Sequence, residues 1–163
     1  MKKVAIGKIV GTHGIKGEIR ILSNFDLKEK VFVPGFKLYF DNEEFIITRY
    51  RHHKKYEMVT LEGFNNINEV LKYKGMIVYV NRNDLNLESR DYLLSDLVGM
   101  NVLENEILIG KVENIVYNNA NILLEIASEK NFYIPVNDNF IENVSLENNE
   151  IKVKNIKGLM LWK

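Results

Sequence analysis

The sequence predicts an all-β protein of two small β-barrel domains joined by a short linker, with one short helix near the end of the first domain. Ile and Val together account for 33 of the 163 residues, whereas Ala occurs three times. β-branched residues favour strands and Ala favours helices. Short apolar stretches recur about every ten residues between polar turns, a spacing typical of closed or partly closed barrels.

The charged residues are divided unevenly between the two halves, although the formal net charge is zero. Residues 1–82 carry 15 basic and 9 acidic side chains, a net charge of +6. Residues 83–163 carry 7 basic and 13 acidic side chains, a net charge of −6. This division favours two modules with different partners, although a simple drift of charge along the chain would give the same counts. We place the first domain at residues 1–82, the linker at 83–91 and the second domain at 92–163.

Local patterns define the elements of the first domain. Apolar or alternating stretches predict strands at Val4–Val10, Glu18–Ser23, Phe36–Phe40, Glu44–Tyr50, Tyr56–Leu61 and Met76–Val80. The short helix is expected from Asn66 to Tyr73, because apolar residues recur there with helical spacing at Ile67, Val70 and Leu71. Asn66 is placed to cap this helix, with Glu69 three residues later and Gly75 at its end.

The second domain follows a polar segment, Asn81–Arg90, which supplies most of the linker. Further strands are expected at Val98–Leu103, Ile107–Tyr117, Asn121–Ile126, Asn131–Pro135, Phe140–Leu146 and Glu150–Val153. The turns between these strands are rich in Asn or Glu, and Leu146–Glu150 is expected to connect the last hairpin.

Composition excludes several classes of protein. The chain has no cysteine, so disulfides, thiolate nucleophiles and zinc ribbons are excluded, and a reducing cytoplasm is the expected location. Apolar runs such as Ile122–Leu124 are far shorter than the ~20 residues of a membrane span. The first residues lack the apolar core of a secretory signal, so none is expected.

The residues that most often carry catalysis or bind metal are sparse. Histidine occurs only at positions 13, 52 and 53, and the adjacent His52 and His53 would face opposite sides of a strand. The sequence also contains no Gly-x-Ser-x-Gly elbow. We therefore expect no catalytic residue, no metal site and no cofactor.

The glycine-rich stretch Gly11–Gly17 leaves two interpretations open. It matches neither nucleotide-binding glycine pattern, and it leads into a strand where a phosphate loop would lead into a helix. It is therefore either a connection whose glycines adopt positive φ, or an exposed loop whose His13 and Lys16 also contact phosphate or a partner protein. Both roles can hold together.

Basic residues in the first half indicate a surface for RNA. Aromatic and histidine side chains interleave with several of them and could stack on unpaired bases. The candidate RNA-facing residues are His13, Lys16, Arg20, Arg51, His52, Lys54 and Lys55. A solvated hairpin tip explains the residues around Lys54 equally well.

The stretch from Ile6 to Ile21 resembles the N-terminal signature of the RimM family of bacterial ribosome maturation factors. The resemblance rests on Gly-Lys-Ile at 7–9, His-Gly-Ile-Lys-Gly-Glu at 13–18, and alternating basic and apolar residues after them. In the second half, residues 92–102 resemble the family's linker into its second domain. The stretches 109–115, 119–126 and 134–135 fit a PRC-barrel, and residues 158–160 resemble its C-terminal end. The resemblance spans about residues 4–160 and preserves the order of the motifs.

This resemblance implies a translation-factor-like barrel followed by a PRC-barrel. It also implies a small-subunit assembly factor, or chaperone, that binds the subunit head and its ribosomal protein nineteen. Such proteins promote late maturation and processing of small-subunit rRNA and are not known as enzymes. We expect a monomer that touches rRNA of the immature head and has no membrane partner. The alternatives are a stand-alone RNA-binding, translation-factor-like module and an enzyme that acts on rRNA.

In the family, two adjacent aromatic residues at the start of the second domain help to bind that ribosomal protein. They fall here on Tyr92 and Leu93, and Leu93 departs from the pattern because it offers no ring or hydroxyl. Ile122 is a second departure, at a turn where the family often has Asp. The candidate protein-binding residues are Tyr92, Leu93, Leu94, Asp96 and Leu97. Core packing is the alternative role, and for Leu94 and Leu97 it is the one we favour.

Overall fold

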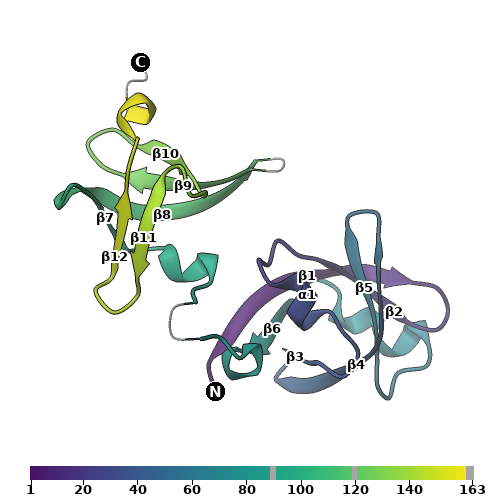
Figure 1. The fold of residues 1–163 in the computed structure, drawn as a ribbon. Helices are drawn as coiled ribbons and strands as arrows, with labels where there is room; N and C mark the ends of the chain where they lie inside the picture. The colour runs from purple at the N-terminus through teal and green to yellow at the C-terminus, as the bar shows by residue number, and fades with distance from the viewer. Residues whose placement is uncertain (89–90, 119–120, 161–163) are drawn as a thin grey trace. The chain divides into compact units, whose positions relative to one another are not determined.

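A computed structural model describes residues 1–88, 91–118 and 121–160 (Figure 1). The chain divides into two compact units, Met1–Leu87 and Glu88–Lys163, each built mainly from strands. The prediction of an all-β fold with two domains is thus confirmed. Residues 89–90 of the predicted linker, residues 119–120 of the family-like motif and the last three residues lie outside the described part of the chain.

Six strands form the first unit. They are β1 (Lys3–His13), β2 (Glu18–Leu22), β3 (Lys37–Phe40), β4 (Glu43–His53), β5 (Tyr56–Leu61) and β6 (Ile77–Asn81). Antiparallel pairing in the order β1-β2-β5-β4-β3-β6 closes them into a barrel. In β2, the buried Ile19 and Ile21 alternate with outward-facing residues, so the two-residue period of the sequence locates the core.

A one-turn α-helix, α1 (Lys28–Val31), lies between β2 and β3 and was not predicted. Val31 and the following Phe32 are buried, and the Phe32 ring stacks on Tyr50 of β4 with 5.9 Å between ring centroids. The segment is too short for a helical period to stand out in the sequence, and packing of its last residues onto the barrel stabilises it.

The expected short helix near the end of the first unit is present as two 3-10 turns, η1 (Ile67–Glu69) and η2 (Leu71–Tyr73). The predicted cap is also present. The Asn66 side chain accepts a hydrogen bond from the Asn68 N–H at 2.9 Å, and Glu69 accepts one from the Asn66 N–H at 3.1 Å. A further 3-10 turn, η3 (Arg82–Leu85), follows β6 and lies mostly within the segment predicted as linker.

The second unit contains β7 (Asn101–Glu104), β8 (Ile107–Asn118), β9 (Asn121–Ala127), β10 (Phe132–Pro135), β11 (Ile141–Ser145) and β12 (Glu150–Val153). They form a six-stranded sheet in the order β10-β9-β8-β7-β12-β11, in which only the β12–β7 pair is parallel among the described residues. All six strands contribute side chains to one core. The 3-10 turns η4 (Leu94–Leu97) and η5 (Lys157–Met160) flank the sheet in sequence.

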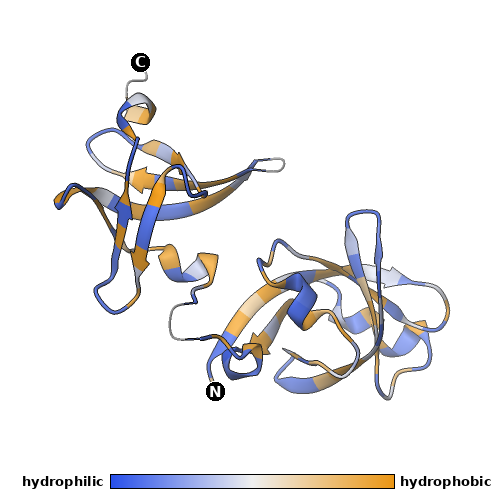
Figure 2. Cartoon of the chain, viewed as in Figure 1, coloured by the Kyte–Doolittle hydropathy of each residue, from blue (hydrophilic) through white to orange (hydrophobic). Residues whose placement is uncertain are grey.

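Hydropathy follows this architecture in both units. Figure 2 shows apolar residues alternating with hydrophilic ones along the strands, while most turns are hydrophilic. In the described part of the chain, no helix is long and apolar enough to cross a membrane.

Candidate functional site

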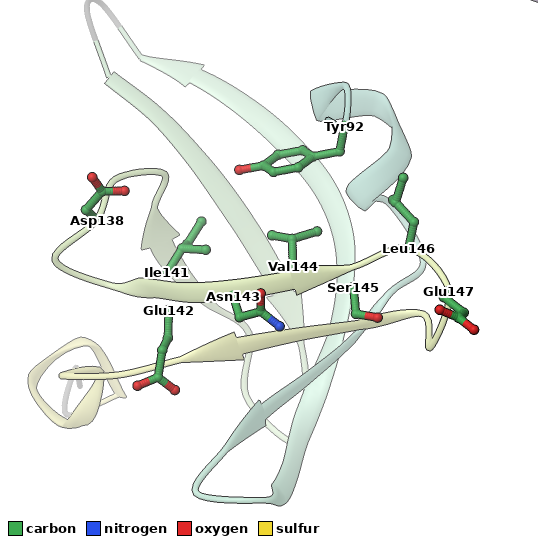
Figure 3. Close-up of a pocket in the computed structure, with 9 residues that line it drawn as sticks. All are labelled: Tyr92, Asp138, Ile141, Glu142, Asn143, Val144, Ser145, Leu146 and Glu147. Carbon is green, nitrogen blue, oxygen red and sulfur yellow. The ribbon is translucent and has the colours of Figure 1, made fainter. Parts of the chain in front are cut away.

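The second unit contains a pocket of about 490 Å³ beside Tyr92, here called the Tyr92 groove (Figure 3). Its lining residues are Tyr92, Asp138, Ile141, Glu142, Asn143, Val144, Ser145, Leu146 and Glu147. Figure 3 shows the Tyr92 ring extending over β11, with Ile141 and Val144 pointing toward the ring and Glu142 pointing away. Asp138 and Glu147 stand at the two ends of the strand.

The groove combines an apolar floor with acidic groups. Tyr92, Ile141 and Val144 are partly buried and pack against the core, and Leu146 is 39% exposed. Asp138, Glu142 and Glu147 form no ion pair with any described residue. An apolar trough with acidic groups around it suits a partner segment that carries basic and apolar side chains.

The segment that carries Tyr92 is anchored from beneath. Leu94 and Leu97 belong to the core of the second unit, and the Asp96 carboxylate accepts a hydrogen bond from the Leu93 N–H at 2.8 Å. This cap satisfies a backbone donor at the start of η4. The anchored turn therefore fixes the position from which Tyr92 projects.

The structure supports core packing for the three leucines of this segment, the role favoured for Leu94 and Leu97 but not expected for Leu93. Leu93 and Leu97 are fully buried and Leu94 is 7% exposed, so they have almost no surface to offer a partner. Their role is packing, and Asp96 is the cap of the turn. The residues of β11 and the three carboxylates were missed, because nothing in the sequence indicates that a strand about 50 residues downstream lies beside Tyr92.

In the first unit, Arg51 of β4 is held by Glu18 of β2, across the intervening strand β5. Two hydrogen bonds of 2.8 Å join the guanidinium to the carboxylate. These hydrogen bonds, reinforced by the charge of Arg51, hold the pKa of Glu18 below its ordinary value despite partial burial. The same hydrogen bonds raise the pKa of Arg51. Much of the positive charge predicted to face RNA at Arg51 is thus neutralised.

Arg20 belongs to a cluster of basic and aromatic side chains. Its Nη2 lies 3.2 Å from His13 Nδ1, and its guanidinium lies 5.4 Å from the centre of the Tyr56 ring. Lys55 Nζ lies 5.6 Å from the same ring, and the His13 and His53 rings are 6.5 Å apart. The structure therefore brings together three predicted RNA-facing residues, His13, Arg20 and Lys55, and adds two rings that can contact bases.

His52 lies in a different network, centred on the buried Glu57 of β5. Glu57 accepts a hydrogen bond from the Tyr50 hydroxyl at 2.6 Å, its Oε1 lies 3.0 Å from His52 Nδ1, and Lys28 Nζ of α1 lies 3.6 Å away. Burial alone would raise the pKa of Glu57, but the hydrogen bonds and the Lys28 charge outweigh it and lower the pKa. Burial, together with the hydrogen bond to Glu57 and its charge, raises the pKa of Tyr50 to about 12.

The other predicted RNA-facing residues, Lys16 and Lys54, are exposed. Lys54 adopts a φ of 56° at the tip of the β4–β5 hairpin, beside the exposed Lys55. Arg49 is also exposed and was not among the predicted RNA-facing residues. Within the described residues, no group of three or more histidine or acidic side chains could hold a metal ion.

The Gly14–Gly17 turn confirms that the glycine-rich connection requires positive φ, with values of 74° at Gly14 and 83° at Gly17. A Cβ on Gly17 would lie 2.7 Å from the Asn66 carbonyl oxygen, whereas one on Gly14 would meet nothing within 4 Å. Substituting Gly14 therefore incurs only the cost of positive φ, whereas substituting Gly17 adds the cost of a clash with the backbone.

We expect Gly17→Ala to lower the free energy of unfolding of the first unit by about 2 kcal/mol or more, because it combines strain with the clash. Gly14→Ala carries the strain alone and should cost about 1 kcal/mol. Hydrogen exchange of the β1 and β2 amides measures both. Equal losses for the two variants would show that the contact with Asn66 is not tight.

Two family models match the chain, "RimM N-terminal domain" over residues 4–85 and "RimM PRC barrel domain" over residues 94–159. The chain is 36% identical to a ribosome maturation factor RimM of Staphylococcus haemolyticus and 38% identical to one of Staphylococcus aureus. Each alignment covers 97% of this chain and 99% of the relative. A solved structure described as a 16S ribosomal RNA processing protein RimM from Pseudomonas aeruginosa is 23% identical. It covers 94% of this chain and 97% of that one, with a TM-score of 0.46.

Proposed function

The chain belongs to the RimM family of ribosome maturation factors, and from this membership we propose that it assists assembly of the small ribosomal subunit in the cytoplasm by binding the immature subunit head. The Tyr92 groove is the observation that carries the proposal furthest, because it gives the second unit a surface of defined chemistry. In this proposal the protein performs no bond chemistry. It favours one assembly state by binding that state more tightly than the alternatives.

The partner proposed for the Tyr92 groove is ribosomal protein nineteen of the small subunit. A protein that binds rRNA is expected to be basic, and Asp138 and Glu147 at the two ends of β11 supply the opposite charge at the groove. Tyr92, Ile141 and Leu146 offer apolar surface that such a contact would cover. Bare RNA is disfavoured at this groove because the carboxylates repel phosphate.

The partner proposed for the first unit is rRNA of the subunit head. The cluster around Tyr56 and the exposed lysines at the β4–β5 tip can contact phosphates without reading base sequence. Arg51 and His52 contribute less, because their polar atoms already have partners in Glu18 and Glu57. The late maturation and processing of rRNA proposed for this protein then follow from holding RNA and protein in one arrangement.

We expect the double variant Lys54→Gln, Lys55→Gln to bind immature small subunits less tightly at low salt. The logarithm of the binding constant falls linearly with the logarithm of the salt concentration, and each phosphate contact adds to the slope. Losing the contacts of both lysines should make this slope shallower by about one to two. Co-sedimentation over a series of salt concentrations measures this slope. Lys37→Gln with Lys152→Gln is the control, since these lysines lie outside the cluster and the tip. An unchanged slope in the tip variant would assign Lys54 and Lys55 to a solvated hairpin.

A further inference from the structure

Ile15 is a large apolar side chain that is 83% exposed on a turn whose backbone is fixed. The Gly17 N–H donates to the Gly14 carbonyl at 3.3 Å, and the Ile67 N–H donates to the Ile15 carbonyl at 2.9 Å. Gly17 is in addition closely packed against the Asn66 backbone. The turn is thus tied to the start of η1, and it holds Ile15 out into solvent.

Beside this turn lies a pocket of about 470 Å³, here called the Ile15 pocket, between the turn and strands β4 and β5. The residues that matter in its lining are His13, Ile15, Lys16, Arg49, Tyr50 and Thr60. The volume falls within the range of small-ligand sites. The apolar side chain of Ile15 and the cationic side chains of Lys16 and Arg49 therefore line one hollow.

The charge of the Ile15 pocket is positive. Lys16 and Arg49 are exposed and form no ion pair with any described residue. Glu18 also lines the pocket, but its two carboxylate oxygens accept hydrogen bonds from Nε and Nη2 of Arg51. An adjoining hollow of about 340 Å³ shares Lys16 and Arg49 but includes the exposed Glu62, which makes it less suited to an anion.

We propose that the Ile15 pocket binds one unpaired nucleotide of RNA, with its phosphate between Lys16 and Arg49 and its base against Ile15. This inference rests on the proposed function, because it assumes that the first unit faces rRNA. The two cations alone would suit either a phosphate or an acidic peptide side chain. The apolar surface beside them, which a base can cover, favours the nucleotide. A base inside a duplex is stacked on both faces and cannot enter a pocket, so the ligand is a looped-out or single-stranded nucleotide.

The test measures by fluorescence anisotropy how tightly the full chain binds two labelled RNAs. One is a single-stranded hexanucleotide, and the other is a blunt duplex of the same composition. Ile15→Ser and Arg49→Gln should each weaken binding of the single strand about tenfold and change binding of the duplex less than twofold. Lys54→Gln is the control, because this lysine lies outside the pocket and should affect both RNAs alike. Thermal unfolding of each variant verifies the fold, and Ile15→Val, which keeps most of the apolar surface, should retain binding.

Equal effects of Ile15→Ser on the two RNAs, or none on either, would overturn the nucleotide site. If Ile15→Ser instead weakens binding of a ribosomal protein and leaves RNA binding unchanged, the nucleotide site is likewise overturned. The turn is then assigned to a protein contact. Co-sedimentation of the unaltered chain with immature small subunits is measured on the same preparation. Suppose that the unaltered chain binds subunits while Ile15→Ser leaves the preference for single-stranded RNA unchanged. That result rejects the nucleotide site in the Ile15 pocket but leaves the proposed function intact.

Discussion

Replacing Tyr92 with Ala is expected to weaken binding of ribosomal protein nineteen of the small subunit about 20-fold, which corresponds to about 2 kcal/mol. The ring extends over β11 and forms one wall of the Tyr92 groove, so its removal opens the apolar trough to water (Figure 3). The core beneath it is left in place, since Leu94 and Leu97 still anchor the turn. Isothermal titration with the purified ribosomal protein measures the change in affinity.

Two matched variants make the Tyr92 experiment specific. Tyr133→Ala removes a tyrosine that is 45% exposed on β10 of the same unit but does not line the groove, so it should leave the affinity unchanged. Tyr92→Phe keeps the ring and should retain most of the binding, because the apolar face provides the contact. If Tyr92→Ala binds as tightly as the unaltered chain while its unfolding temperature is preserved, the groove is not the protein-binding surface.

Replacing Glu57 with Ala is expected to lower the free energy of unfolding of the first unit by about 3 kcal/mol. The Glu57 side chain is almost fully buried and joins β5 to β4 through Tyr50 and His52, and to α1 through Lys28. Its removal leaves the partly buried Tyr50 hydroxyl without its 2.6 Å hydrogen bond. Hydrogen exchange of the β4 and β5 amides reports on this unit separately from the second one.

The same carboxylate predicts a dependence on pH. The pKa of Glu57 is lower in the folded protein than its ordinary value of 4.5, so its ionised form stabilises the fold. This contribution is fully present above pH 4.5 and is lost as the pH falls through the folded-state pKa. Glu57→Gln, which keeps the shape and one acceptor, should therefore be less stable than the unaltered chain at pH 7, and the difference should shrink in acid. A difference that stays constant from pH 7 to pH 3 would show that the Glu57 charge contributes nothing.

Much of the fold could be predicted because its signals are local. Alternation in β2 gives the buried face directly, and Asn66 with Glu69 forms the predicted capping box. Both patterns involve residues within a few positions of each other, and neighbouring residues there favour the same local structure. α1 was missed because its stability comes from Phe32 and Val31 packing onto the barrel.

The proposed binding surfaces were predictable only in part, because they depend on contacts made in the folded chain. The resemblance singled out Tyr92, but the acidic and apolar residues of the groove come from β11 and its flanking loops, which meet Tyr92 only in the folded unit. Charge alone also overstated Arg51 and His52, since Glu18 and Glu57 lie 33 and 5 residues away and bind them. Cross-strand register decides which cations keep a free charge, and one sequence does not reveal that register in advance.

The most direct test of the proposed function is an electron cryomicroscopy image of this protein bound to an immature small subunit. We predict that the second unit contacts ribosomal protein nineteen of the subunit head through the Tyr92 groove, with β11 and its acidic residues at the contact. We also predict that the Tyr56 cluster and the β4–β5 tip face rRNA phosphates. An image in which the Tyr92 groove lies open to solvent, or in which the protein binds away from the subunit head, would contradict the proposal.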